Sequence, residues 1–250
     1  MEKNFLTYEL EINGLRQEVQ FTDTAVEEIF MPFLHELTAL RMTLDRKVIA
    51  YLVGAPGSGK STVATFLEQL SRQRQSEVDT IRALGMDGYH FSAAYMNITT
   101  VERDGKPVLM RDIKGAPETF DVDLLVDKIR EVRQEGTDWN IYDRRIHDVL
   151  PDYLNVEDDI ILIEGNYLLL KETGWTNVRT LADYSVFLDV PKDILRERLI
   201  NRKAQGGLSR EDVEKFFEFS DARNIERIIN NSAQADETWK LSDTGEFIKA

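Results

Sequence analysis

The residues with the clearest chemical meaning form a glycine-rich loop that ends in lysine and serine. The pattern G-x-x-x-x-G-K-[ST] places backbone N–H groups around phosphates, brings the lysine to the β and γ phosphates and offers a hydroxyl to Mg²⁺. An apolar run precedes the loop and a helical apolar spacing follows it, as a strand–loop–helix unit requires. We therefore predict a nucleotide phosphate site formed by Gly54, Ala55, Pro56, Gly57, Ser58, Gly59, Lys60, Ser61 and Thr62.

An aspartate directly follows the strand predicted at 79–86. Phosphoryl transfer to a hydroxyl needs a group that accepts the hydroxyl proton, and a carboxylate at a strand end facing the γ-phosphate is suitably placed. We interpret Asp87 as this base. A ligand of Mg²⁺-bound water and an ordinary turn residue are the alternatives, because Asp-Gly is also common in turns.

A second carboxylate ends the apolar strand predicted at 159–164. In proteins with such a loop, an acid at the end of a buried strand holds Mg²⁺ or its waters. Glu164 is therefore predicted to complete a metal site with Ser61. The alternative is that Glu164 caps the segment that follows.

Two arginines lie four residues apart on the helix predicted at 192–204, just before Gly206 and Gly207. This spacing places Arg198 and Arg202 on one helix face, where they could neutralise charge on a transferring phosphoryl group. The paired glycines would let the segment close as a lid over about 196–210. The alternative is a solvated helix face.

Two polar loops offer further side chains that could contact a substrate. The first, 111–121, offers Arg111 and Lys114 for substrate oxygens, although a charged loop is most often simply solvated. The second follows the strand predicted at 139–142 and includes His147, for which a structural role is the alternative.

Composition excludes several functional classes. The 250 residues carry a formal net charge of −14, which argues against a nucleic-acid-binding surface, and the absence of cysteine excludes disulfides and thiolate metal sites. No run approaches the roughly 18 apolar residues of a membrane span, and the N-terminus lacks a signal-peptide pattern. We expect a cytoplasmic protein that binds neither nucleic acid nor membrane.

Strand and helix patterns alternate from residue 46 onward, which predicts an α/β fold with a mostly parallel sheet covered by helices on both faces. Ligands of such sheets bind beyond the carboxyl ends of the strands. The predicted strands are 47–53, 79–86, 139–142, 159–164 and 184–189. The predicted helices are 60–73, 121–134, 192–204 and 209–231.

Two further segments flank this unit. Residues 1–45 are predicted as an appendage, with a β-hairpin turning at Asn13-Gly14 and a helix capped near Thr22 and interrupted by Pro32. Residues 236–250 are predicted as a closing hairpin, so that the main domain spans 46–250. The N-terminal hairpin presents an edge that a second copy could extend, and a homodimer is one expectation.

Taken together, these motifs resemble the phosphoribulokinase, uridine kinase and bacterial pantothenate kinase group of P-loop kinases over about residues 47–231. The similarity is strongest to bacterial kinases described as fructose-transport-associated or nucleoside/nucleotide kinase-like. The segments that carry it are Gly54–Ser61, Met86–His90, Lys114–Asp121, Tyr142-Asp143 with His147, Glu164–Leu170, and Arg198–Arg202 with Gly206-Gly207-Leu208.

The resemblance implies transfer of the γ-phosphoryl group of Mg²⁺–ATP to a hydroxyl of a small molecule. By this resemblance Asp87 matches the family's catalytic aspartate and Glu164 its acid near Mg²⁺, and Lys114 and Tyr142 match positions that line the acceptor pocket of pantothenate kinases. Lys60, Arg198 and Arg202 are the further catalytic candidates. Tyr89, His90 and Arg144 complete the predicted acceptor contacts. Where pantothenate kinases tend to carry histidine this chain has Arg144, and it lacks the Tyr-Asp-Phe stretch of pyrimidine-nucleoside kinases.

Two other functions compete with the kinase. One is an NTPase switch, although no Asn-Lys-x-Asp string for guanine recognition is present. The other is a regulatory module that binds a nucleotide without turnover. The presence of Lys60, Ser61, Asp87 and Glu164 together favours the kinase.

Overall fold

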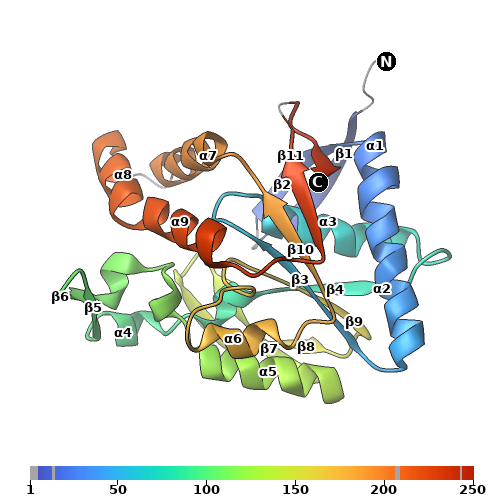
Figure 1. The fold of residues 1–250 in the computed structure, drawn as a ribbon, viewed down its shortest axis with the longest axis horizontal. Coiled ribbons are helices and arrows are strands. Elements are labelled where there is room, and N and C mark those ends of the chain that lie inside the picture. The colour runs from blue at the N-terminus through green and yellow to red at the C-terminus, as the bar shows by residue number, and fades with distance from the viewer. Residues whose placement is uncertain (1–4, 13–14, 206–208, 243) are drawn as a thin grey trace.

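The computed structural model describes residues 5–12, 15–205, 209–242 and 244–250, and within them the largest sheet has six strands (Figure 1). Their order is β12–β11–β10–β3–β9–β4. The strands are β3 (Val48–Gly54), β4 (Ile81–Gly85), β9 (Ile160–Gly165), β10 (Tyr184–Asp189), β11 (Glu237–Leu241) and β12 (Phe247–Lys249). Only β12 runs antiparallel to its neighbour, and helices cover both faces, so the predicted α/β class is confirmed.

The hairpin predicted for residues 236–250 is present, and it is part of the main sheet. β11 pairs in parallel with β10, and β12 pairs antiparallel with β11, so both strands extend the main sheet. Every residue of β3 is buried, since this central strand has sheet neighbours on both sides and helices over both faces.

The helices lie close to their predicted ranges. The helix predicted at 209–231 consists of two α-helices, α8 and α9, with a π-helical turn at Phe217–Asp221 between them. Within the described residues, no helix has the length and hydropathy that crossing a membrane requires. The helices after β3 are α3 (Lys60–Gln73), α4 (Ala93–Met96), α5 (Val122–Gln134), α6 (Trp175–Arg179), α7 (Lys192–Gln205), α8 (Arg210–Phe216) and α9 (Ala222–Asn231).

The strand predicted at 139–142 exists, but its expected place in the central sheet is wrong. β7 (Thr137–Asp143) pairs antiparallel with β8 (Asp148–Val156), which the sequence did not reveal, in a separate hairpin. Trp139 is buried, and its Nε1 donates to the Gly85 carbonyl at 3.0 Å. β7 thus covers the end of β4 and does not pair with it. A second unpredicted hairpin joins β5 (Thr100–Arg103) and β6 (Lys106–Leu109).

The N-terminal hairpin is confirmed: β1 (Phe5–Ile12) pairs antiparallel with β2 (Leu15–Thr22). Its predicted turn, Asn13-Gly14, lies outside the described residues. The helix that follows comprises α1 (Asp23–Ala25), a π-helical turn (Val26–Phe30) and α2 (Met31–Leu44). Pro32 has no N–H to donate, and the helix accommodates it with a wider turn just before it, without ending.

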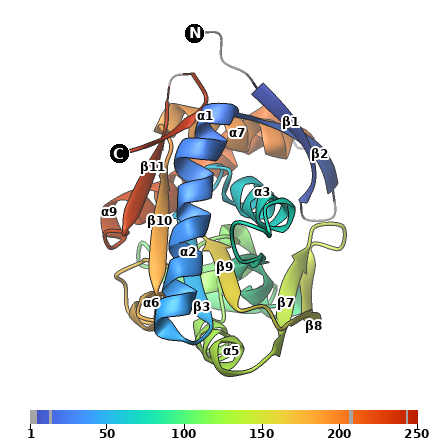
Figure 2. The ribbon, with the colours of Figure 1, turned by 90° about the vertical axis from the view of Figure 1, so that its right-hand side faces the viewer.

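Aromatic rings attach the N-terminal segment to α3, the helix that begins at the phosphate loop (Figure 2). The Phe66 ring on α3 lies 4.7 Å from the ring of Tyr8, 4.3 Å from that of Phe21 and 5.4 Å from that of Phe30. Such pairs add about 0.5–1.5 kcal/mol each to the burial of apolar area. The hairpin and α2 therefore belong to one hydrophobic core with the sheet.

One buried carboxylate fixes the start of β3, the strand that leads into the phosphate loop. Asp183 accepts hydrogen bonds from the Ile49 N–H at 2.9 Å and from the guanidinium groups of Arg46 and Arg133. Burial alone raises the pKa of Asp183, but these hydrogen bonds outweigh burial and hold the pKa below its usual 3.8.

We expect Asp183→Asn to lower the free energy of unfolding by about 2 kcal/mol at pH 7, because both guanidinium groups lose a charged partner. The contribution of a carboxylate with a lowered folded-state pKa is present above the unfolded-state pKa and disappears as the pH falls through the folded-state value. The difference between wild type and variant should therefore shrink below about pH 4 in urea unfolding. Asp127→Asn, at an exposed ion pair with Arg130, is the control. Equal differences at pH 7 and pH 3 would contradict the assignment.

Candidate active site

The phosphate loop adopts a conformation that depends on two of its glycines. Gly57 and Gly59 have φ values of 85° and 92°, in the left-handed region that favours glycine. α3 begins directly afterwards at Lys60, so its N-terminus faces the space above the loop. The Lys60 side chain is buried and curls back over the loop, donating to the Ala55 carbonyl at 3.1 Å.

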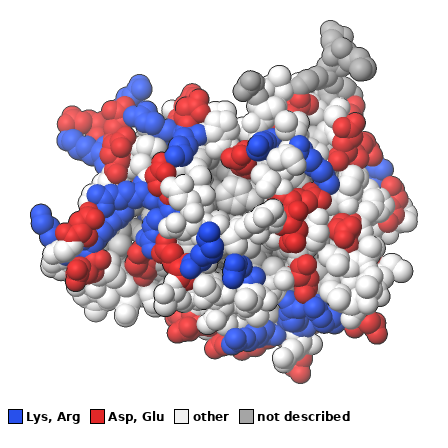
Figure 3. Space-filling model, in the orientation of Figure 1, with Lys and Arg blue, Asp and Glu red and all other residues white. Residues whose placement is uncertain are grey.

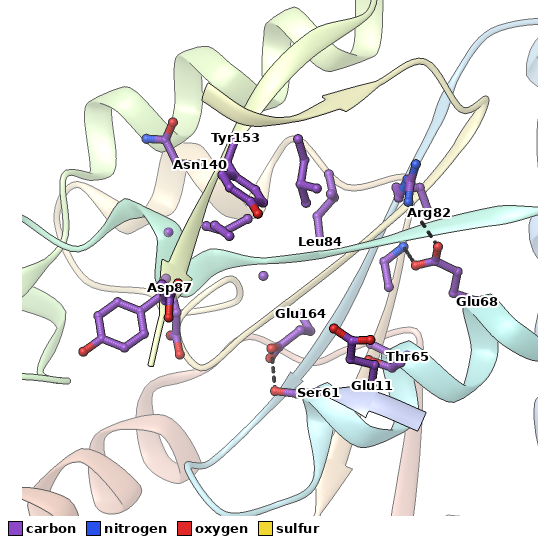
Figure 4. Close-up of a pocket in the computed structure, with 18 of the residues that line it drawn as sticks. Glu11, Ser61, Thr65, Glu68, Arg82, Leu84, Asp87, Asn140, Tyr153 and Glu164 are labelled. Atoms are coloured by element: carbon purple, nitrogen blue, oxygen red, sulfur yellow. Dashed lines mark hydrogen bonds and ion pairs between the residues drawn. The ribbon is translucent and has the colours of Figure 1, made fainter. Parts of the chain in front are cut away.

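The two predicted metal ligands lie in direct contact. Ser61 Oγ donates to Glu164 Oε1 at 2.6 Å, which joins the start of α3 to the end of β9 (Figure 4). Burial raises the pKa of Glu164, the charge of Lys60 lowers it, and the nearby Asp87 raises it further. Three predicted site residues therefore act on each other electrostatically.

Asp87 lies in a 3₁₀ turn, Met86–Tyr89, directly after β4. Its side chain is 44% exposed, so a ligand can reach it, and one carboxylate oxygen lies 4.0 Å from the Arg144 guanidinium. Burial lowers the pKa of Lys60, while the charges of Glu164 and Asp87 raise it. β3, β4 and β9 are parallel neighbours that end at one edge of the sheet, which brings these groups together as the sequence predicted.

The predicted lid arginines extend from α7 toward this edge. Arg198 donates to the Gly57 carbonyl at 3.2 Å, which fixes it against the phosphate loop. The positive charge of Arg202 contributes to the lowering of the Lys60 pKa, so it acts on the same space. The predicted hinge, Gly206 to Leu208, lies outside the described residues, and the lid stays a prediction.

Some of the predicted acceptor residues are hydrogen-bonded to one another, and others have exposed side chains. Lys114 donates to the Tyr142 hydroxyl at 2.8 Å and to the His147 carbonyl at 3.0 Å, and these hydrogen bonds tie the 111–121 loop to β7. His147 takes part through its backbone, and its side chain is exposed. Arg111 is also exposed and lies 3.4 Å from its neighbour Asp112, as the solvated alternative describes.

Tyr89 and His90, which follow Asp87 in the chain, both point into the protein core. His90 stacks on Phe120 with 3.8 Å between ring centres, and its Nδ1 lies 3.1 Å from the Thr119 carbonyl oxygen. Burial lowers the pKa of His90, which favours the neutral ring, and its predicted contact with substrate stays a prediction. Tyr89 is 1% exposed and packs edge-on against Trp139, so its side chain is closed to a ligand in this conformation, and its predicted contact with substrate stays a prediction.

A cavity of about 780 Å³ opens beside these groups, between α3, β4 and the β7–β8 hairpin. Ser61, Asp87 and Glu164 line this cavity (Figure 4), as does Tyr142, while His90, Lys114 and Arg144 are not among its lining residues. The sequence analysis did not connect several of its polar lining residues with a site. These are Glu11, Thr65, Glu68, Gln69, Arg72, Arg82, Asn140 and Tyr153.

One sequence signal for part of this wall was available. Ser61, Thr65 and Glu68 follow one another at helical spacing and therefore share a face of α3. Glu68 then accepts from the backbone N–H of Ala83 at 2.9 Å and pairs with Arg82, both on β4. The residues from Glu11 and the β7–β8 hairpin are distant in the chain, and no local pattern could place them here.

The surface near the site carries a local excess of cations despite the acidic composition. Lys and Arg gather on the side of α7, α8 and the β5–β6 hairpin, interspersed with acidic residues (Figure 3). Within the described residues, no group of three or more His, Asp or Glu side chains could hold a metal ion by itself. A cation here would take part of its coordination from a ligand or from water.

Comparisons with known proteins agree with this geometry. The phosphoribulokinase / uridine kinase family model matches residues 48–238, so the chain belongs to this family of P-loop kinases. The chain is 38% identical over 240 residues to the uncharacterised protein YggC of Escherichia coli, covering 96% of this chain and 97% of YggC. A Schizosaccharomyces pombe protein provisionally named a uridine kinase is 32% identical over 170 residues, covering 66% of this chain and 69% of that protein.

A solved structure shares the fold. The crystal structure of a protein from Silicibacter sp. TM1040, provisionally named a fructose transport system kinase, matches with a TM-score of 0.69 and 28% identity. The match covers 81% of this chain and 98% of that one. Kinase chemistry on a P-loop is thus the general activity of the family, whereas the acceptor differs among the names of its members.

Proposed function

We propose that this chain transfers the γ-phosphoryl group of ATP to a hydroxyl group of a small molecule. The observation that carries this proposal is the meeting of Lys60, Ser61, Asp87 and Glu164 at the ends of three parallel strands, beside a cavity of about 780 Å³. A phosphate loop alone would serve any nucleotide-binding protein. A reachable carboxylate and a ligand-sized cavity next to the loop are what a second substrate requires.

The residues suggest a direct in-line transfer. The backbone N–H groups of the loop and Lys60 bind the β and γ phosphates, and the acceptor hydroxyl lies in the cavity beside Asp87. Asp87 takes the hydroxyl proton while the acceptor oxygen bonds to the γ phosphorus. The bond from that phosphorus to the β–γ bridging oxygen breaks, and ADP leaves. Arg144 and Arg202 offset the charge of the transferring group.

Ser61 and Glu164 fit Mg²⁺. A hydroxyl and a carboxylate 2.6 Å apart are hard oxygen ligands, and Mg²⁺ is ordinarily held by one or two such groups together with phosphates and waters. When bound here, the ion supplies positive charge that neutralises the phosphates. The site needs no third protein ligand.

We expect Glu164→Gln to raise the Mg²⁺ concentration that gives half-maximal turnover about tenfold or more, because the amide keeps the size of the side chain but loses its charge. Affinity for ATP measured without Mg²⁺ should not fall. A Mg²⁺ dependence equal to that of the wild type would assign Glu164 to the capping role instead.

The acceptor surroundings favour an anionic or hydroxyl-rich compound. Arg144 lies 4.0 Å from Asp87, and Lys114 is hydrogen-bonded to Tyr142. Arg82 and Arg145 line the cavity, where Arg82 pairs with Glu68 and Arg145 with Asp143. Guanidinium groups bind carboxylates and phosphates in two-pronged geometry, and they also donate to sugar hydroxyls. Sugars, sugar acids, nucleosides and pantothenate-like acids are therefore the compounds to test first.

The test measures ADP release from Mg²⁺–ATP with and without each member of such a panel, and identifies the product by mass spectrometry and phosphorus NMR. We expect one chemical class to accelerate ADP release and to gain one phosphoryl group. ADP release that no acceptor changes would favour an NTPase. Tight ATP binding without turnover across the panel would favour a regulatory module, and either result would contradict the proposal.

A further inference from the structure

A second pocket lies on the other side of the phosphate loop from the cavity that contains Asp87. Its volume is about 290 Å³, and its floor is formed by Gly57, Ser58, Gly59 and Thr62. The two pockets share no lining residue. The loop therefore separates the cavity next to the carboxylates from this second space.

The walls of the second pocket come from the two ends of the chain. Phe5, Val19 and Phe21 belong to the N-terminal hairpin, and Leu241 and Phe247 to β11 and β12. Both walls lie outside residues 48–238, the part of the chain that matches the family model. The floor of this pocket thus belongs to the matched part of the chain, and these wall residues lie beyond it.

The lining combines apolar and polar groups in similar measure, which suits a flat ring system with hydrogen-bonding edges attached to phosphates. The aromatic and aliphatic walls are accompanied by polar side chains, among them Gln20, Glu246 and Arg198. Apolar walls with few polar groups are typical of small-molecule sites, whose volumes begin near about 300 Å³. Arg198 also donates to the Gly57 carbonyl, so the pocket rim and the loop are in contact.

The hairpin wall is held firmly against the loop helix. Tyr8 and Phe21 pack on Phe66, which lies on α3 two turns after Lys60. The same hairpin brings Glu11 to the cavity on the opposite side of α3. An element fixed in this way can present Phe5 and Val19 at a constant position relative to bound phosphates.

We propose that this pocket holds the nucleoside part of ATP, and that the N-terminal hairpin forms one wall of the nucleotide site. The triphosphate then crosses the loop, with its γ end at Ser61, Glu164 and Asp87 and its nucleoside end between the two terminal hairpins. This inference rests on the proposed function for its ligand. It gives the N-terminal segment a direct role in donor binding, beyond packing.

The test compares two ligands that differ only in the nucleoside. A non-hydrolysable ATP analogue should contact both the loop and the pocket, whereas inorganic triphosphate contacts the loop alone. Phe5→Ala should weaken binding of the analogue about tenfold in calorimetry, because the base loses an aromatic wall. Val19→Phe, which narrows the pocket, should weaken it in the same way. Both variants should bind triphosphate like the wild type.

Leu6→Ala is the matched control. Leu6 is adjacent to Phe5 on the same strand and is 36% exposed against 47% for Phe5, but it does not line the pocket. It should bind both ligands as the wild type does, and thermal unfolding should confirm that all three variants fold.

The results that would contradict this inference can be told apart. Unchanged analogue binding in Phe5→Ala and Val19→Phe, with the wild type still active, would overturn this inference and leave the proposed kinase standing. Equal weakening of both ligands would show that the hairpin only positions the loop, and would overturn the wall assignment. Failure of the wild type to bind either ligand would remove the proposed function itself.

Discussion

Asp87→Asn should lower turnover about a thousandfold once an acceptor is known, because the amide keeps the size of the side chain but accepts no proton. General bases typically contribute factors of about 10² to 10⁴. The structure supports the role by placing Asp87 at the end of β4, 44% exposed and lining the cavity. Affinity for ATP should stay near the wild-type value, so that the loss appears in kcat and not in KM for ATP.

Asp112→Asn is the control for this experiment, since Asp112 is equally accessible and pairs only with its neighbour Arg111 on the surface. Turnover near wild type in Asp87→Asn would remove Asp87 as the base. A loss that rising Mg²⁺ restores would instead assign Asp87 to the metal-bound waters, the alternative left open by its sequence context.

Gly88→Ala should lower the free energy of unfolding by about 3 kcal/mol or more, because a Cβ at this position would lie 2.1 Å from the carbonyl oxygen of Asn140. The contact is backbone against side chain, so no rotamer change can relieve it. The turn Met86–Tyr89 and β7 would have to separate, and Asp87 lies in that turn. We therefore expect activity to fall together with stability.

Gly85→Ala is a closely matched control. Its added Cβ would meet Glu164 Oε1 at 3.8 Å and the Asp87 N–H nitrogen at 4.0 Å, both ordinary contacts, and its backbone is extended. Denaturant unfolding of the two variants measures the difference. Equal stability of Gly88→Ala and Gly85→Ala would show that β7 can move away from the turn at little cost.

The surroundings of Gly88 also show what a sequence pattern can miss. The Asp-Gly pair suggested ordinary turn chemistry, where glycine supplies a positive φ. In the structure, Gly88 is not among the residues with positive φ, and the space beside Asn140 is what requires it. Pattern and structure agree on glycine but for different physical reasons, and only the contact explains the expected cost.

The sequence by itself determined the phosphate loop, the α/β class and the four residues that meet at the strand ends of the sheet. These follow from local rules, since a loop between strand and helix places Lys60 and Ser61 within consecutive residues, and parallel strands end at one edge of the sheet. Asp87 and Glu164 could be predicted as site residues because each lies at the end of a predicted strand.

The tertiary structure alone decided how distant segments share a space. In the structure β7 lies outside the central sheet and covers the end of β4, and Tyr89 is buried against Trp139. The two terminal hairpins lie together at the phosphate loop. The physical reason is that packing depends on side-chain volume and shape across the whole chain, which no local spacing records. The loop at Gly54 to Ser61 predicted a nucleotide site, and the packing of residues from both chain ends forms the pocket that we propose for the nucleoside.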